Sequence, residues 1–189
     1  MPPAKESVDI VFVGRLVNEK GIETLLRSIA YLKKDTHKVS VAIIGEGPER
    51  GELEALAGRL DIQDMVTFWG KIESDEKVMS IMKSAKIFVY SATPEGGWSI
   101  SVIEANACGL PIISVQSGAL GDNEVVIDGY NGLLIREPSA ETMAEKINLL
   151  LEDESLRRKL SKNALDFAKE QDWGNLAKKV EEFYRQVIR

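Results

Sequence analysis

The sequence of 189 residues has very few of the side chains that build disulfides, catalytic triads and metal centres. It contains one cysteine, Cys108, and one histidine, His37. A single cysteine excludes an internal disulfide and fits a reducing compartment. His37 precedes a strand at the edge of the sheet away from the expected ligands, so no Ser/His/Asp triad can be assembled around it. With no Asp-x-Asp pair and no His/Cys cluster, we expect no metal site.

Long apolar runs and an excess of positive charge are also absent. No segment is long and apolar enough to span a bilayer, and the first seven residues contain no apolar signal core. We therefore expect a cytoplasmic protein. The formal net charge of -6 argues against a general nucleic-acid binder. Hydrophobic residues make up 44% of the chain and charged residues 29%, which is ordinary for a globular domain with its own core.

Short β-branched runs alternate with amphipathic helical runs along the chain. This alternation predicts an α/β fold, a single doubly wound, Rossmann-like parallel sheet that ends in helices. We expect strands at 8–13, 39–44, 66–69, 87–90, 112–115 and 132–135, and a helix at 22–33. From Ser139 onward the pattern is helical, with Ser139 and Ser155 as N-cap residues. Such sheets bind ligands in the crevice at the carboxyl ends of their strands.

The most informative segment is 94–111, where a glycine-rich turn runs into a short helix of small and apolar residues. Glu95 lies at the mouth of the turn and Glu104 lies inside the apolar stretch, where an unpaired charge would be expensive. Gly109 can end the helix in the left-handed conformation, and Pro111 prevents its continuation. Amides at a helix N-terminus attract phosphate. The segment therefore predicts a pocket for a phosphorylated, hydroxyl-rich ligand.

A second loop, after the first expected strand, carries two cations. The strand ends at Gly14, Arg15 and Lys20 follow five residues apart, and Gly21 opens a helix. Isolated loop cations are usually solvated. Here the neighbouring glycine-rich loop favours a binding role, because two fixed positive charges beside helix amides suit a diphosphate.

These motifs resemble those of the GT-B glycosyltransferases, specifically the large retaining family of that fold that uses nucleotide-sugars. Residues 104–111 match the family's Glu-Ala-Met-Ala-x-Gly-x-Pro, and residues 14–21 match its Gly-Arg-Leu-x-x-x-Lys-Gly. Residues 124–132 match Glu-Val-Val-x-Asp-Gly-x-Asn-Gly, which we interpret as structural. Glu95 departs from the family spacing by one extra residue, and it keeps its family place if the doubled glycine bulges outward.

The resemblance covers about residues 9–171 and implies the C-terminal half of a GT-B fold. It implies that Arg15 and Lys20 hold the donor's diphosphate, that Glu95 contacts the donor sugar near the reacting carbon, and that Glu104 binds the ribose hydroxyls. The other implied donor contacts are Gly14, Gly45, Lys71, Ile72, Gly97, Trp98, Ser99 and Ile100. Taken alone, the loop of Gly45 would be interpreted as an ordinary strand-to-helix turn, and its neighbours favour the binding role.

By the same resemblance, the parent enzyme is a metal-independent hexosyltransferase that needs no cofactor and uses a UDP-, GDP- or ADP-sugar. Its acceptor would bind an N-terminal domain absent from this sequence, and peripheral membrane association would follow for a membrane-bound acceptor. Residues 172–189 would brace that domain, and the present chain alone would be inactive. The alternatives are a non-catalytic nucleotide-sugar-binding module, which the irregular glutamate spacing favours, or the donor-binding subunit of a two-chain enzyme. A weaker alternative is another nucleotide enzyme on this fold, such as an epimerase.

Overall fold

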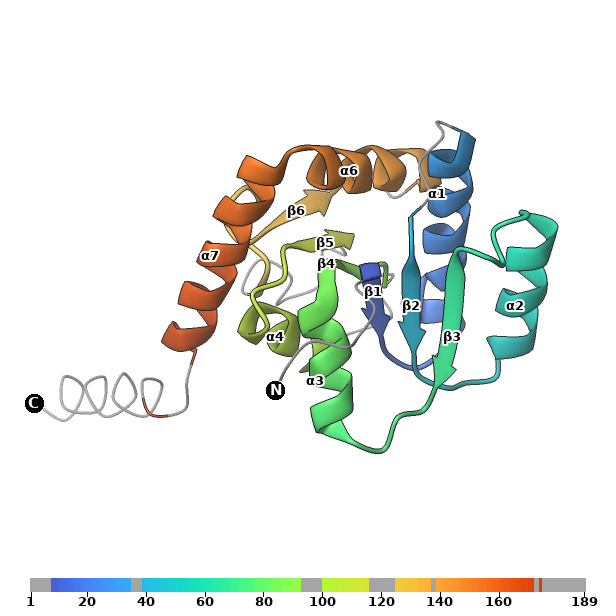
Figure 1. Cartoon of the computed structure of the whole chain (residues 1–189), viewed down its shortest axis with the longest axis horizontal. Coiled ribbons are helices and arrows are strands. Elements are labelled where there is room, and N and C mark those ends of the chain that lie inside the picture. The colour runs from blue at the N-terminus through green and yellow to red at the C-terminus, as the bar shows by residue number, and fades with distance from the viewer. Residues whose placement is uncertain are drawn as a thin grey trace, which may run out of the picture.

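The computed structural model describes residues 8–34, 39–92, 100–115, 125–136, 139–171 and 174. Within them, parallel strands form one six-stranded sheet in the order β3-β2-β1-β4-β5-β6 (Figure 1). The strands are β1 Val8–Val13, β2 Val41–Ile44, β3 Val66–Gly70, β4 Ala85–Tyr90, β5 Ile112–Val115 and β6 Gly132–Ile135. The prediction of a single parallel α/β sheet is confirmed.

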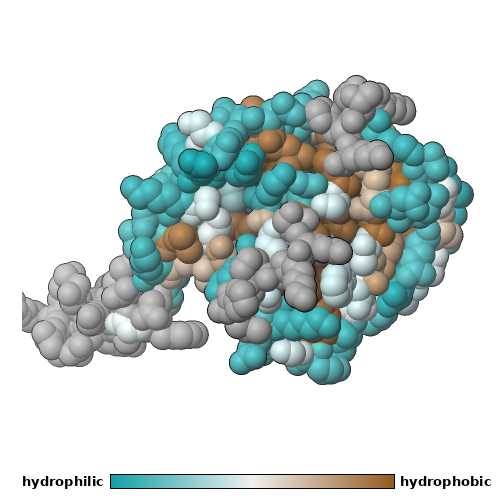
Figure 2. Space-filling view, in the orientation of Figure 1, coloured by the Kyte–Doolittle hydropathy of each residue, from teal (hydrophilic) through white to brown (hydrophobic). Residues whose placement is uncertain are grey.

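Helices connect the strands and cover both faces of the sheet. They are the short 3-10 helix η1 Asn18–Lys20, then α1 Ile22–Lys34, α2 Arg50–Arg59, α3 Asp75–Ser84, α4 Ile100–Ala107, α6 Ala140–Glu152 and α7 Glu154–Glu170. One hydrophobic core joins α1, α2 and α6 to the sheet, and a second joins α3 and α4 to the opposite face. Figure 2 shows hydrophilic side chains along the rim of the molecule and hydrophobic ones gathered toward the middle of the same face.

Alternation along the strands explains the two cores. In β1, Ile10 and Phe12 enter the first core and Val11 enters the second. All residues of β2 and β5 are buried, so these strands are continuous apolar runs, as expected where helices cover both faces.

Side-chain caps fix where the helices begin. The Ser139 hydroxyl accepts a hydrogen bond from Thr142 N over 3.1 Å, which confirms Ser139 as an N-cap. The prediction for Ser155 is wrong, because Asp153 Oδ1 accepts from Leu156 N over 2.8 Å and α7 begins at Glu154. A carboxylate at this position also interacts favourably with the positive end of the helix dipole.

Three strand boundaries differ from their expected places: β2 begins at Val41, β3 ends at Gly70 rather than at residue 69, and β4 begins at Ala85 rather than at residue 87. The first of these differences has a local reason. The strand expected to begin at residue 39 begins at Val41, because Ser40 N donates to the Asp9 carboxylate over 2.8 Å instead of joining the ladder. His37 and residues 172–173 and 175–189 lie outside the described residues. Among the helices that the structure describes, none has the length and apolar character to cross a membrane.

The sheet order reverses at its centre. β1 lies between β2 and β4, so the chain first winds outward through β2 and β3 and then returns to place β4 on the other side of β1. This reversal is the switch point at which doubly wound sheets bind ligands, outside the carboxyl ends of the strands.

Candidate functional site

A cavity of about 390 Å³ opens at the carboxyl ends of β1, β2 and β3. Its wall brings together six of the residues predicted for the site: Gly14, Arg15, Gly45, Lys71, Ile72 and Glu104. They come from three different loops and from α4, so the topology assembles them. The apolar part of the wall includes Val78 and Met79 of α3.

Backbone hydrogen bonds join the three loops of this cavity into one unit. Gly14 N donates to Ile44 O over 3.0 Å, and Gly45 N donates to Gly70 O over 2.9 Å. Gly45 has a φ of +140°, and a Cβ at this position would lie 1.8 Å from Gly14 O. Only glycine fits here, and the absence of a side chain leaves the backbone accessible from the cavity.

Glu104 lies half-buried on α4 in the wall of the cavity. Burial raises the pKa of its carboxyl, and the negative charge of Asp75 raises it further. None of the described residues donates a hydrogen bond to the Glu104 side chain. A half-buried carboxylate without donors is stabilised by a ligand that donates hydrogen bonds to both of its oxygens.

The helix that carries Glu104 is fixed at both of its ends. Near its start, the buried Ser101 hydroxyl donates to Val13 O at the end of β1 over 2.9 Å. Near its end, Asn106 accepts a hydrogen bond from Asn131 over 2.9 Å, and Gly109 turns the chain with a φ of +70°, as predicted. Asn131 belongs to the 124–132 motif, which therefore supports the helix that carries Glu104. The Asn106–Asn131 pair was not predicted, although an asparagine within an apolar helix was a signal for it.

Lys20 takes a different position from Arg15. It ends η1 and is only 7% exposed, and its Nζ lies 3.5 Å from the Tyr90 hydroxyl at the end of β4. Burial lowers the pKa of Lys20, and the charge of Arg15 lowers it further. The part of the cavity wall formed by described residues does not include Lys20.

Of the other predicted contacts, the structure describes Ile100 and the side chain of Lys71 but not the residues of the glycine-rich turn. Ile100 opens α4 and is 73% exposed, and the Lys71 side chain forms an ion pair with Glu73 over 2.7 Å. Glu95, Gly97, Trp98 and Ser99 lie outside the described residues, and their roles stay predictions.

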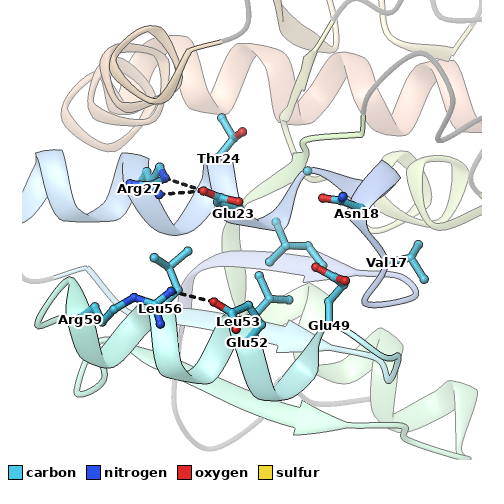
Figure 3. Close-up of a pocket in the computed structure, with 12 residues that line it drawn as sticks. Val17, Asn18, Glu23, Thr24, Arg27, Glu49, Glu52, Leu53, Leu56 and Arg59 are labelled. Carbon is cyan, nitrogen blue, oxygen red and sulfur yellow. Dashed lines mark hydrogen bonds and ion pairs between the residues drawn. The ribbon is translucent and has the colours of Figure 1, made fainter.

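A larger cavity, of about 580 Å³, lies between α1 and α2 (Figure 3). Leu53 and Leu56 project into it from α2. Its two arginines are already paired with carboxylates, Arg27 with Glu23 over 2.8 Å and Arg59 with Glu52 over 2.9 Å. The smaller cavity is the better candidate because it lies at the switch point and contains an arginine and a carboxylate with no ion pair among the described residues. Among the described residues, no three His, Cys, Asp or Glu side chains are grouped to hold a metal ion.

Comparison with known sequences places these features in a family. Residues 2–167 match the family described as glycosyl transferases group 1. An uncharacterized glycosyltransferase from Methanocaldococcus jannaschii is 33% identical over 186 residues, which cover 97% of this chain and 46% of that protein. The chain thus spans about half the length of the curated relatives it matches.

Solved structures share the fold. The C-terminal domain of a glycosyl transferase group 1 family protein from Francisella tularensis superposes with a TM-score of 0.76 at 22% identity, covering 90% of this chain and 94% of that one. The Anabaena protein HepE, crystallised in complex with UDP, superposes with a TM-score of 0.81 at 22% identity, covering 95% of this chain and 49% of that one.

Proposed function

Since the chain belongs to the glycosyl transferases group 1 family, we propose that it is the donor-binding half of a retaining glycosyltransferase that uses a nucleoside diphosphate sugar. The observation that carries this proposal is the cavity that joins Arg15 and Glu104 at the switch point of the sheet. The sugar transferred is of the hexose type, as in the family that the sequence motifs resemble.

Each residue has a role that its chemistry suits. Arg15 and Lys20 bind the diphosphate and offset the negative charge that grows on the nucleoside diphosphate as it leaves. Glu104 accepts hydrogen bonds from the two ribose hydroxyls. The bare backbone at Gly14 and Gly45 lets the nucleotide lie close to the sheet. Glu95 contacts the sugar near the reacting carbon.

The base lies against the backbone of Lys71 and Ile72, beside the apolar wall of α3. The fold relative from Anabaena was crystallised with UDP, which makes UDP the first ligand to test. GDP and ADP are the other candidates. No further cofactor is needed for this chemistry.

The acceptor binds a separate N-terminal domain, which the chain's share of its relatives' length supports. Holding an acceptor against the sugar carbon can account for about 7–11 kcal/mol of a reaction barrier. These residues alone should therefore bind the donor but not transfer the sugar. If the acceptor is a lipid, the whole enzyme associates peripherally with the membrane that contains it.

Calorimetric titration with UDP, GDP and ADP tests the proposal. Arg15→Ala should weaken the preferred diphosphate by about 1.5–3 kcal/mol, because a charge-assisted contact is lost, and should leave the free nucleoside unaffected. Glu104→Gln should weaken the ribonucleotide more than its dideoxy analogue. Arg158→Ala, which changes an exposed arginine of α7, is the matched control. Failure of all three nucleotides to bind at millimolar concentration would refute the proposal.

The extra residue between Glu95 and Glu104 favours a second candidate, a binding module without turnover. The two are separated by assaying sugar transfer from a chain that includes the N-terminal domain. A non-catalytic module would bind the donor with or without the N-terminal domain and would transfer the sugar in neither case. A two-chain enzyme would instead recover transfer when a separate acceptor-binding chain is added.

A further inference from the structure

Two neighbouring residues at the end of β4 hold Lys20 at two points. The Ser91 hydroxyl donates to the backbone oxygen of Lys20 over 2.8 Å. The Lys20 ammonium donates to the Tyr90 hydroxyl over 3.5 Å, and its nitrogen lies 5.4 Å from the centre of the Tyr90 ring. The Ser91 contact holds the backbone of Lys20, and the Tyr90 contact holds its ammonium group in place.

The backbone at Lys20 and Gly21 packs closely against the end of β4. Lys20, Tyr90 and Ser91 are all buried. Gly21 follows Lys20 with a φ of +62°, and a Cβ there would lie 2.1 Å from Ser91 O. The Lys20 backbone therefore has little room to move relative to β4. A lysine side chain normally loses rotamer freedom when it binds a ligand, and one that is already held loses less.

We propose that Tyr90 and Ser91 are positioning residues, which hold the Lys20 ammonium where the donor diphosphate binds. This inference rests on the proposed function. Tyr90 acts through Lys20 and does not itself touch the donor. Its hydroxyl accepts a hydrogen bond from the ammonium, and the face of its ring attracts the positive charge. Both contacts favour the charged form of a buried lysine, whereas burial and Arg15 oppose it and Glu19 favours it.

Calorimetric titration of Tyr90 variants tests the inference, with whichever of UDP, GDP and ADP binds the unaltered protein most tightly. Tyr90→Phe removes the hydroxyl and should weaken the nucleoside diphosphate about fivefold. Tyr90→Leu also removes the ring and should weaken it about tenfold or more. Neither change should alter the affinity for the free nucleoside. Tyr130→Phe, on the surface before β6, is the matched control and should bind like the unaltered protein.

A double substitution separates positioning from general damage. In a chain that already carries Lys20→Ala, Tyr90→Phe should change the affinity less than twofold, because its route to the ligand is gone. A fivefold loss that persists in that background would overturn the inference. If the unaltered protein binds no nucleoside diphosphate, the proposed function fails first. If it binds and Tyr90→Phe binds equally well, only the positioning role fails.

Discussion

Asn131 donates a hydrogen bond from its side-chain nitrogen to the side-chain oxygen of Asn106 over 2.9 Å, and both side chains are completely buried. The pair joins the turn before β6 to the helix that carries Glu104. Its remaining polar atoms are also satisfied. Asn106 Nδ2 donates to Val125 O over 3.1 Å, and Asn131 Oδ1 accepts from Ile127 N over 2.7 Å. A closed polar network thus lies behind the candidate donor site.

Asn131→Ala should lower the free energy of unfolding by about 2–3 kcal/mol, because it leaves the buried Asn106 Oδ1 and the partly buried Ile127 N without these partners. Urea denaturation measures this loss. Asn163→Ala is the control, since that side chain donates to Tyr130 O at the surface and should cost less than about 0.5–1 kcal/mol. A loss at Asn131 no larger than that of the control would show that the network contributes nothing to stability.

The titration of Glu104 should appear in both stability and binding. Its pKa is raised in the folded protein above the ordinary value of 4.5, so the folded state binds more protons than the unfolded state just above that pH. The stability that Glu104 contributes therefore falls as the pH rises from 4.5 through its raised pKa. Glu104→Gln should be more stable than the unaltered protein at neutral pH, and this advantage should disappear below pH 4.5. Thermal melts across pH measure the difference.

Ribonucleotide affinity should rise with pH over the range in which the stability contributed by Glu104 falls. Binding needs the ionised carboxylate, so affinity should fall as the pH drops through the raised pKa of Glu104. The dideoxy analogue lacks the hydroxyls and should not show this component. Identical pH profiles for the two ligands would contradict ribose recognition by Glu104.

Gly45→Ala should damage both the sheet and the cavity. The new Cβ would collide with Gly14 O, and the φ of +140° disfavours any side chain, so we expect a loss of at least about 2 kcal/mol in unfolding free energy. Gly58→Ala is the matched control. It lies in α2 with open space around its Cβ position, and it should stabilise the protein by about 0.5–1 kcal/mol. Equal effects of the two changes on denaturation would contradict the close packing of the β1 and β2 loops.

Cys108 should resist alkylation while the protein is folded. Burial raises the pKa of its thiol to about 11, and its sulfur lies 3.8 Å from that of Met79. Since the thiolate is the reactive form, iodoacetamide at pH 8 should modify the folded protein about a hundredfold more slowly than the unfolded protein. Mass spectrometry follows the reaction. Similar rates in the two states would show that Cys108 is exposed.

Periodicity made most of the fold predictable. Buried strands such as β5 are continuous apolar runs, and helices such as α1 carry an apolar stripe, so their places follow from the sequence. The prediction that glycine-rich loops gather at one edge also required only the direction of parallel strands. The strand order was not predictable from these patterns. β3 exposes part of its length, which suits an edge, but β1, β2, β4 and β5 all contain buried apolar runs, and any of these four could in principle occupy the centre.

Side-chain partners were harder to predict because they depend on contacts between distant segments. Ser155 resembled an N-cap locally, but Asp153 holds that position. Arg15 and Lys20 share one motif, yet Arg15 lines the cavity and Lys20 contacts Tyr90. The Asn106–Asn131 pair joins two motifs that are separate in the chain. Each of these outcomes was decided by packing that no short window of sequence contains.

The central pairing of β1 with β4 has a consequence for how the protein folds. β1 ends at the loop of Arg15 and Lys20. Tyr90 and Ser91, which hold Lys20, lie at the end of β4, after three complete crossover connections. Closing so long a loop costs entropy before its contacts form, so we expect the halves of the site to meet late in folding. A nucleotide that needs both halves would then slow unfolding and leave the folding rate unchanged. Its protection would be kinetic, lengthening the life of a native state it did not help to form.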